Sequence, residues 1–192
     1  MLLETIIYGR GGQGGVTAGN ILVLAAMYEN LYGQSFPFFG AERRGAPVTA
    51  FVRISDKPIL RHGMFSEADI LIVLDSRLLD IGVVKNIRVR DKGFVIVNYP
   101  PEKDLKRDKL NLAGESSIYV VDATRIAMEN KLVVAGWPVV NTCILGAFSK
   151  ATGVIKIDNV IKAIKEYFGG KIGEINAKAA REAYDKTVRV EV

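Results

Sequence analysis

Short hydrophobic runs alternate along the chain with longer stretches in which apolar residues recur every three or four positions. Residues 69–75, 94–98 and 117–122 are almost continuously apolar, which is typical of strands buried on both faces of a parallel sheet. Two further strands are predicted at residues 5–8 and 48–54. The pattern therefore predicts strands along the first two thirds of the chain.

Helical periodicity fills the segments between these strands and most of the last third. Residues 17–32 place Ile21, Leu24, Ala25 and Tyr28 on one stripe, as a helix packed on a sheet does. Further helices are predicted at residues 123–132, 141–151, 158–168 and 177–188. Alternation of this kind predicts an α/β fold, a three-layer sandwich with a mostly parallel sheet.

The three last helices differ in polarity. Residues 141–151 are small and apolar, so we expect this helix to pack between layers. Residues 158–168 carry one apolar face, with Asp158 as the expected N-cap. Residues 177–188 have the pattern of an amphipathic helix with one face in solvent. No internal repeat or low-complexity tract divides the chain, so a single domain over residues 1–192 is predicted.

Composition narrows the class of protein. No hydrophobic stretch reaches the roughly 18 residues that a membrane span needs. The N-terminus lacks the basic region and cleavage site of a signal peptide, so we expect a cytoplasmic protein. The single cysteine, Cys143, excludes an intrachain disulfide, and no iron–sulfur cluster or cysteine-rich zinc site can be built from this chain alone. We expect no metal site.

The charged residues do not favour a nucleic-acid partner. The net charge of +5 is modest, and acidic residues are interspersed among the basic ones instead of leaving one basic face. The charge-dense segment 100–108 mixes both signs with two prolines and is best interpreted as a solvated connection. Two glutamines, one cysteine and abundant Lys and Glu hint at a thermophile.

A glycine-rich loop follows the first predicted strand. It consists of Gly9, Arg10, Gly11, Gly12, Gln13, Gly14 and Gly15. A strand that turns through glycines into a helix directs backbone N–H groups and the positive end of the helix dipole at one place. Arg10 adds a positive charge beside them. The loop therefore predicts a Rossmann-like site for a ligand with phosphate groups.

The spacing Gly9-x-Gly11-x-x-Gly14 matches the dinucleotide-binding fingerprint only in part. That fingerprint also requires an acidic residue about twenty positions later, at the end of a second strand, to bind the ribose. Glu29 lies inside the predicted helix, and Glu42 lies in a loop beside two arginines. The missing half is the one that specifies NAD. The alternative is a tight glycine turn that serves packing only.

A second loop, residues 36–47, combines aromatic residues, glycines and paired arginines. Arg43 and Arg44 could bind phosphate through bidentate hydrogen bonds. The aromatic residues could stack on a base or anchor the loop in the core. The alternative is an ion pair between Glu42 and an arginine that closes a surface loop. Because loops after early strands meet at one edge of a doubly wound sheet, we expect this loop to face the glycine loop.

Few residues suggest catalysis. His62 has no Asp, Ser or Cys pattern around it, and Cys143 is best interpreted as a small buried hydrophobe. Asp75 ends a predicted strand, where capping the next helix is the simplest role. No Walker Lys-Ser/Thr follows the glycine loop, and no thiamine diphosphate motif is present. We therefore predict no catalytic residue and expect a chain that binds a ligand.

Several segments together resemble the gamma subunit of 2-oxoacid:ferredoxin oxidoreductases, most of all the pyruvate (pyruvate synthase) type. They are residues 9–15 (Gly-Arg-Gly-Gly-Gln-Gly-Gly), 39–47 (Phe-Gly-Ala-Glu-Arg-Arg-Gly-Ala-Pro), 51–55 and the helix entry at 141–146. The resemblance covers nearly the whole chain. It implies a complex that decarboxylates a 2-oxoacid on thiamine diphosphate, reduces ferredoxin through iron–sulfur clusters and transfers the acyl group to coenzyme A.

In such a complex the alpha, beta and delta subunits are the expected partners. Thiamine diphosphate, Mg²⁺ and [4Fe-4S] clusters would belong to those subunits, whereas the gamma subunit is associated with the coenzyme A side of the active site. Coenzyme A carries a 3′-phosphate and a pyrophosphate, so the binding residues are expected in the two loops. They are Gly9, Arg10, Gly11, Gly12, Gln13, Gly14, Gly15, Glu42, Arg43, Arg44 and Gly45.

Three alternatives stay open. The subunit could belong to, or be shared with, a branched-chain 2-oxoacid enzyme, because the substrate pocket of such complexes lies largely in other chains. A free-standing NAD(P)-binding Rossmann protein is disfavoured by the missing ribose carboxylate. A purely structural subunit, whose glycine loop packs on a partner, is the third.

Overall fold

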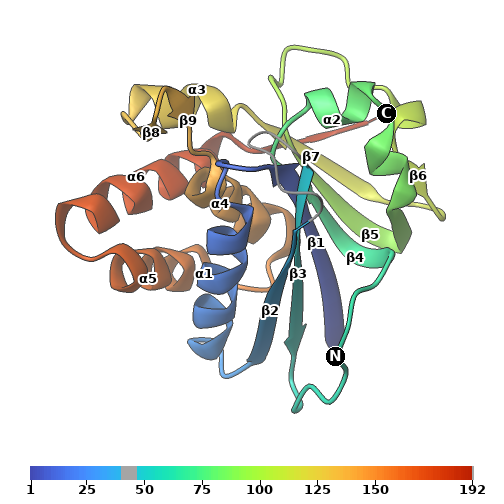
Figure 1. Cartoon of the computed structure of the whole chain (residues 1–192), viewed down its shortest axis with the longest axis horizontal. Helices are drawn as coiled ribbons and strands as arrows, with labels where there is room; N and C mark the ends of the chain where they lie inside the picture. The colour runs from blue at the N-terminus through green and yellow to red at the C-terminus, as the bar shows by residue number, and fades with distance from the viewer. Residues whose placement is uncertain (40–46, 192) are drawn as a thin grey trace.

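The computed structural model describes residues 1–39 and 47–191, and a mixed eight-stranded sheet forms its centre (Figure 1). The strands run in the order β10-β7-β5-β4-β1-β3-β2, with β6 beside β5. They are β1 (Leu2–Arg10), β2 (Tyr32–Phe39), β3 (Pro47–Ser55), β4 (Glu67–Val73), β5 (Arg88–Asn98), β6 (Asn111–Leu112), β7 (Ser117–Val121) and β10 (Val188–Val190).

The centre of the sheet is parallel, as the apolar runs predict. Strands β1, β4, β5 and β7 pair in parallel, and β6 adds to β5 in the same direction. The edges are antiparallel, because β3 and β2 continue the sheet beyond β1 while β10 pairs with β7. The predicted α/β architecture is confirmed.

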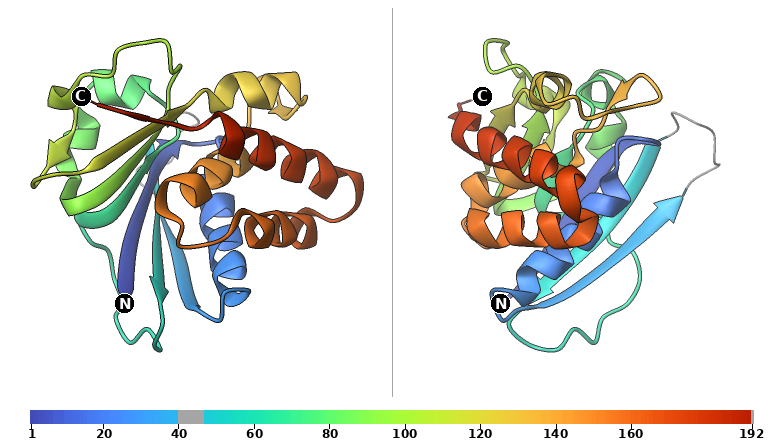
Figure 2. Two further views of the ribbon diagram at one scale, coloured as in Figure 1. Left: turned by 180° about the vertical axis from the view of Figure 1, so that it is seen from behind. Right: turned by 90° about the vertical axis from the view of Figure 1, so that its left-hand side faces the viewer.

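Helices cover the two faces of this sheet unequally (Figures 1 and 2). They are α1 (Gly15–Met27), α2 (Arg77–Asp80), α3 (Ala123–Glu129), α4 (Asn141–Thr152), α5 (Ile157–Phe168) and α6 (Gly170–Lys186), with the short 3-10 turns η1 (Val83–Asn86) and η2 (Arg107–Lys109). On one side α1 and α4 lie against the strands with α5 and α6 beyond them, and on the other side lie α2 and η1.

The buried strands have two apolar faces, which explains their continuous hydrophobic runs. Ile7 and Ile72 belong to the core beneath α1 and α4, whereas Ile6 and Leu71 belong to the core beneath α2 and η1. Successive side chains of a strand point to opposite faces, so a strand covered on both sides must be apolar at every position. None of the described helices combines the length and hydrophobicity needed to cross a bilayer.

The helix predicted at 17–32 ends earlier, because the backbone breaks at Asn30. Asn30 adopts a positive φ of 57°, and the Leu31 N–H returns to the Ala26 carbonyl at 3.0 Å. This closes the helix in the manner of a C-terminal cap. Strand β2 then begins at Tyr32, and it includes residues 36–39, which the sequence placed in a loop. Of these, Phe36 stacks on Phe51 at 5.2 Å between ring centroids, so this aromatic residue anchors the sheet.

Helix α5 begins without the predicted side-chain cap. Asp158 lies in its first turn and pairs with Arg181 of α6 instead of acting as the N-cap. The N-terminus of α5 is held by Glu29, whose carboxylate accepts hydrogen bonds from the Lys156 backbone N–H at 2.8 Å and from Asn159 at 2.9 Å. Glu29 thus has a structural role in joining α1 to α5.

Helix α6 is longer than its sequence pattern predicts. It begins at Gly170 and packs a row of alanines, among them Ala177, Ala180 and Ala183, against the neighbouring helices. A Cβ at Gly146 of α4 would lie 1.9 Å from the Ala180 carbonyl oxygen, so the two helices touch backbone to backbone. The predicted packing of α4 between layers is confirmed. Helix α6 is amphipathic with one face in solvent, as predicted.

Candidate functional site

The carboxyl ends of β1 and β4 lie side by side, and the chain leaves them toward opposite faces of the sheet. After β1 the chain enters α1 on one face, and after β4 it enters α2 on the other. The Leu74 N–H donates to the Tyr8 carbonyl at 2.8 Å, which extends the ladder to the end of both strands. Open α/β sheets bind ligands in the crevice at such a switch point.

The glycines of the loop after β1 have different tasks. A Cβ at Gly9 would lie 2.9 Å from Leu74 Cδ1, and one at Gly14 would lie 2.5 Å from Asn141 Nδ2. Gly14 also adopts a φ of 80° as the N-cap of α1. Gly12 is exposed with a φ of 95°, and a Cβ there would meet none of the described residues. Two glycines therefore serve packing, and one allows an open turn.

Gln13 stabilises this loop through both the oxygen and the nitrogen of its side-chain amide. Its Oε1 accepts a hydrogen bond from the Arg10 backbone N–H at 2.7 Å, and its Nε2 lies 3.4 Å from Asp75 Oδ2. The Gln13 backbone N–H donates in turn to the Arg10 carbonyl at 3.1 Å. Gly11 lies between them, and Gly15 begins α1. Gln13 is thus a residue that shapes the loop.

Asp75 lies at the mouth of the crevice and forms ion pairs with Arg10 and Arg77. Its carboxylate lies 3.0 Å from Arg10 Nε and accepts hydrogen bonds from the Arg77 backbone N–H at 3.0 Å and from its Nη2 at 2.7 Å. Burial of Asp75, 5% exposed, raises its pKa, but the hydrogen bonds and charge of Arg77 and the charge of Arg10 outweigh this and lower the pKa below its usual value.

Asp75 therefore does more than bind the start of α2. The N-cap of α2 is Ser76, and Asp75, the residue before it, accepts a hydrogen bond from the first helical N–H, that of Arg77. The same carboxylate also holds two guanidinium groups. Sequence reasoning missed this site role, and it missed Arg77 entirely. The available signal was the position of Asp75 at the carboxyl end of the parallel strand next to β1.

A cavity of about 370 Å³ opens beside these residues. Its lining includes Arg10, Gly11, Gly12, Gln13, Arg77 and Trp137. A second, more polar hollow of about 570 Å³ adjoins it over the ends of β4, β5 and β7, and the two share Gln13, Arg77 and Trp137. Among the described residues that line the first cavity there are two arginines and no acidic side chain. An anionic ligand would fit this lining best.

Polar groups in the second hollow are already used by the fold. Asn98 donates to the Leu74 carbonyl at 2.9 Å and to Thr124 at 2.9 Å, which ties the ends of β4 and β5 to α3. Asp122 caps α3 by accepting a hydrogen bond from the Arg125 backbone N–H at 2.9 Å. These side chains position the walls of the hollow.

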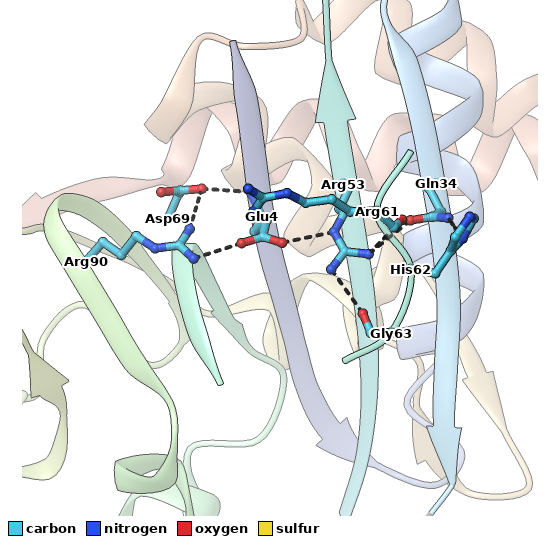
Figure 3. A network of polar contacts seen from close by, with 8 residues as sticks. All are labelled: Glu4, Gln34, Arg53, Arg61, His62, Gly63, Asp69 and Arg90. Atoms are coloured by element: carbon cyan, nitrogen blue, oxygen red, sulfur yellow. Dashed lines mark hydrogen bonds and ion pairs between the residues drawn. The ribbon is translucent and has the colours of Figure 1, made fainter. Parts of the chain in front are cut away.

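The other charged cluster of the sheet lies toward the amino end of β1 (Figure 3). Glu4, 5% exposed, accepts hydrogen bonds from Arg53 at 2.9 Å and from Arg90 at 2.8 Å, and Arg90 also contacts Asp69 at 3.0 Å. Burial raises the pKa of Glu4, but the hydrogen bonds and charges of Arg90 and Arg53 outweigh it and hold the pKa below its usual value. This network joins strands β1, β3, β4 and β5.

His62 and Cys143 have the modest roles that the sequence indicates. His62 is exposed, and its Nδ1 lies 3.4 Å from Gln34 Nε2 beside the Glu4 network. Cys143 is buried in α4, and burial raises the pKa of its thiol to about 12. Within residues 1–39 and 47–191 no three His, Cys, Asp or Glu side chains are grouped as metal ligands would be.

The arginine-rich loop lies mostly outside the described residues. Glu42, Arg43, Arg44 and Gly45 all belong to that segment. The strands on either side of it are described, and Pro47 at the start of β3 pairs with Arg10 at the end of β1. The chain thus enters β3 directly beside the glycine loop. That the two loops face each other stays a prediction.

Comparisons with known proteins agree with the fold. The family model "Pyruvate ferredoxin/flavodoxin oxidoreductase" matches residues 4–186. The "Pyruvate/ketoisovalerate oxidoreductases common subunit gamma" of Pyrococcus furiosus is 50% identical over 97% of both chains. The "Pyruvate synthase subunit PorC" of Methanothermobacter thermautotrophicus is 44% identical over 100% of this chain and 99% of that one. The crystal structure of pyruvate oxidoreductase subunit PORC from Thermotoga maritima superposes with a TM-score of 0.80 at 32% identity, covering 99% of each chain.

Proposed function

The chain belongs to the pyruvate ferredoxin/flavodoxin oxidoreductase family, and we propose that it is the gamma subunit of a complex that oxidises pyruvate. The reaction converts pyruvate, coenzyme A and oxidised ferredoxin to acetyl-CoA, carbon dioxide and reduced ferredoxin. Relatives named as gamma or PorC subunits match this chain over nearly their whole length, which supports this assignment. We propose that this chain contributes the coenzyme A side of the site.

One observation carries the coenzyme A role. The cavity at the switch point is lined by the glycine loop and by Arg10 and Arg77, and Asp75 fixes both guanidinium groups at its mouth. Arginine and backbone N–H groups are the donors that phosphate oxygens prefer. Coenzyme A has two phosphate positions, the pyrophosphate and the 3′-phosphate. Arg43 and Arg44 precede Pro47, which pairs with Arg10, and we propose that they bind one of these groups.

The redox chemistry would then belong to partner subunits. With one cysteine, this chain alone cannot ligate an iron–sulfur cluster. We propose that alpha, beta and delta subunits hold thiamine diphosphate, Mg²⁺ and the [4Fe-4S] clusters, and that ferredoxin docks on the complex. Copurification of a tagged chain from its source tests this, because a lone oligomer without partners of those types would contradict it.

Sharing between two complexes is the second candidate. Relatives about 50% identical to this chain are named as common to pyruvate and ketoisovalerate oxidoreductases. The same chain would then serve a pyruvate and a branched-chain 2-oxoacid enzyme, since it binds the co-substrate that both require. Copurification distinguishes the cases, because a shared subunit brings down two sets of partners and a dedicated one brings down a single set.

Loop variants of the assembled complex test the coenzyme A role. The double variant Arg43→Ala/Arg44→Ala should raise the KM for coenzyme A about tenfold or more, because charged hydrogen bonds to phosphate are lost. Arg125→Ala, which removes an exposed guanidinium from α3, is the matched control. An unchanged coenzyme A dependence in an intact complex would refute the role, and tight NAD(P)H binding by calorimetry would favour a Rossmann dehydrogenase.

A further inference from the structure

A small hairpin outside the main sheet presents a tryptophan to the cavity. Strands β8 (Val133–Val134) and β9 (Trp137–Pro138) pair through Val134 and Trp137. Ala135 and Gly136 both have positive φ, 49° and 81°, which is the backbone of a tight two-residue hairpin turn. The Val139 N–H donates to the Leu132 carbonyl at 2.9 Å and closes the hairpin at its base. The strand pairing, the tight turn and this hydrogen bond therefore define the conformation of the hairpin.

The hairpin exposes its largest apolar side chain. Trp137 is 55% exposed, although an indole usually contributes to a core or an interface. It lines the 370 Å³ cavity together with Arg10 and Arg77, and it also borders the adjoining hollow. A flat aromatic surface and two guanidinium groups thus line one space, whose size is in the range of small-molecule sites.

We propose that Trp137 stacks on the adenine base of coenzyme A, while Arg10, Arg77 and the glycine loop hold the adjacent phosphates. This inference rests on the proposed function and adds the recognition of the nucleotide end. Every base has a π face, and stacking on an aromatic side chain is a general way to bind it. The base and the phosphates of one nucleotide lie close together. A cavity that binds both therefore has to offer an aromatic surface and hydrogen-bond donors.

The charge of the lining favours a nucleotide over a partner protein as the occupant. The indole has apolar neighbours in its own hairpin, Val134 and Ala135, but the rest of the cavity lining consists of Arg10, Arg77, Gln13 and two glycines of the loop after β1. These groups suit an anion that carries an aromatic ring. Docking of the indole on another subunit is kept as an outcome of the test.

Inhibition of the assembled complex by the two halves of coenzyme A tests the inference. Adenosine 3′,5′-diphosphate carries the base, and pantetheine does not. Trp137→Leu should raise the KM for coenzyme A and the inhibition constant of adenosine 3′,5′-diphosphate by the same factor, roughly 5- to 50-fold. The inhibition constant of pantetheine should stay unchanged. Trp137→Phe, which keeps an aromatic face, should change each constant by less than about threefold.

Three results would overturn the inference. An unchanged nucleotide constant in Trp137→Leu would show that the indole does not touch the base. Equal changes for both halves would show a general disturbance of the site. Loss of subunits from Trp137→Leu, seen by size-exclusion chromatography, would show that the indole docks on a partner. If Arg77→Ala raises the KM for coenzyme A but Trp137→Leu does not, stacking fails while the proposed coenzyme A role stands.

Fluorescence of the full chain gives a second readout. Trp137 is the single tryptophan of the sequence, so its emission reports on the hairpin alone. Titration with adenosine 3′,5′-diphosphate should quench this emission in the native chain and less so in Arg77→Ala. Binding of the nucleotide by calorimetry without any change in emission would contradict stacking on the indole.

Discussion

The Arg10 guanidinium and the Asp75 carboxylate meet across the carboxyl ends of two parallel strands, with 3.0 Å between Nε and Oδ2. Asp75 holds Arg77 in the same way from the start of α2. One buried carboxylate therefore positions two cations at the mouth of the cavity. Asp75 acts through these arginines and is a positioning residue.

Replacing Asp75 by Asn should lower the free energy of unfolding by about 1–3 kcal/mol at neutral pH. An amide cannot compensate the two guanidinium charges, and the position of Asp75 itself is buried, although the Arg77 side chain is 60% exposed and stays hydrated. Urea unfolding measures the loss. Asp185→Asn, at an exposed position of α6, is the matched control and should change stability by less than about 0.5 kcal/mol. Equal effects of the two variants would contradict the role of Asp75.

The same carboxylate should make stability depend on acid. The pKa of Asp75 is lower in the folded chain than in the unfolded chain, so the unfolded chain takes up the proton first as the pH falls. Its contribution is fully present above about pH 5 and is lost as the pH falls through the folded pKa. Unfolding free energies measured from pH 6 to pH 2 should therefore fall more steeply in the native chain than in Asp75→Asn. Equal pH dependence of the unfolding free energy in the two proteins would contradict this role of Asp75.

The sequence predicts the parts of this site that are local and misses those that depend on strand pairing. A strand, a glycine loop and a helix follow one another in residues 2–27, so their geometry could be expected from the sequence alone. The ion pair of Arg10 with Asp75 requires β4 to lie beside β1, which no local pattern specifies. Trp137 reaches the cavity from a hairpin late in the chain, for the same reason.

Prediction of the fold from the sequence also failed where an element depends on strand pairing or on close helix packing. Buried parallel strands were predicted well, because burial on both faces leaves a continuous apolar run. Residues 36–39 contain proline and aromatics and suggest a loop, yet pairing with β3 makes them a strand. Helix α6 has a polar pattern because its buried face consists of alanines, which allow close packing against Gly146 but contribute little hydrophobicity to the pattern.

Two neighbouring glycines should respond differently to the same methyl group. Gly14→Ala should destabilise the chain by about 1–3 kcal/mol, because φ is 80° there and the Cβ would lie 2.5 Å from Asn141 Nδ2. Gly15→Ala should be neutral or slightly stabilising, since its Cβ would meet Leu74 at 3.4 Å and the residue begins a helix. Thermal unfolding of both variants checks this. Similar melting temperatures would show that the turn adapts.

The Glu4 network should depend most on Arg53. Arg53 is 3% exposed and donates to Glu4 Oε1 at 2.9 Å, to Gln34 Oε1 at 3.1 Å and to the Gly63 carbonyl at 3.0 Å, and its guanidinium lies 4.8 Å from the Phe65 ring centroid. Arg53→Leu should lower the free energy of unfolding by about 3 kcal/mol, because it leaves a buried carboxylate and three further acceptors without this partner.

Companion variants separate loss of the ion pair from loss of packing. Arg53→Lys keeps the charge but not the planar fork, so it should recover only part of the stability. The double variant Glu4→Gln/Arg53→Leu should lose less than the sum of its single changes, because a neutral amide tolerates burial better than an unpaired carboxylate. Arg125→Ala breaks an exposed pair and should cost less than about 0.5 kcal/mol. If Arg53→Leu costs no more than Arg125→Ala in urea unfolding, the network does not stabilise the fold.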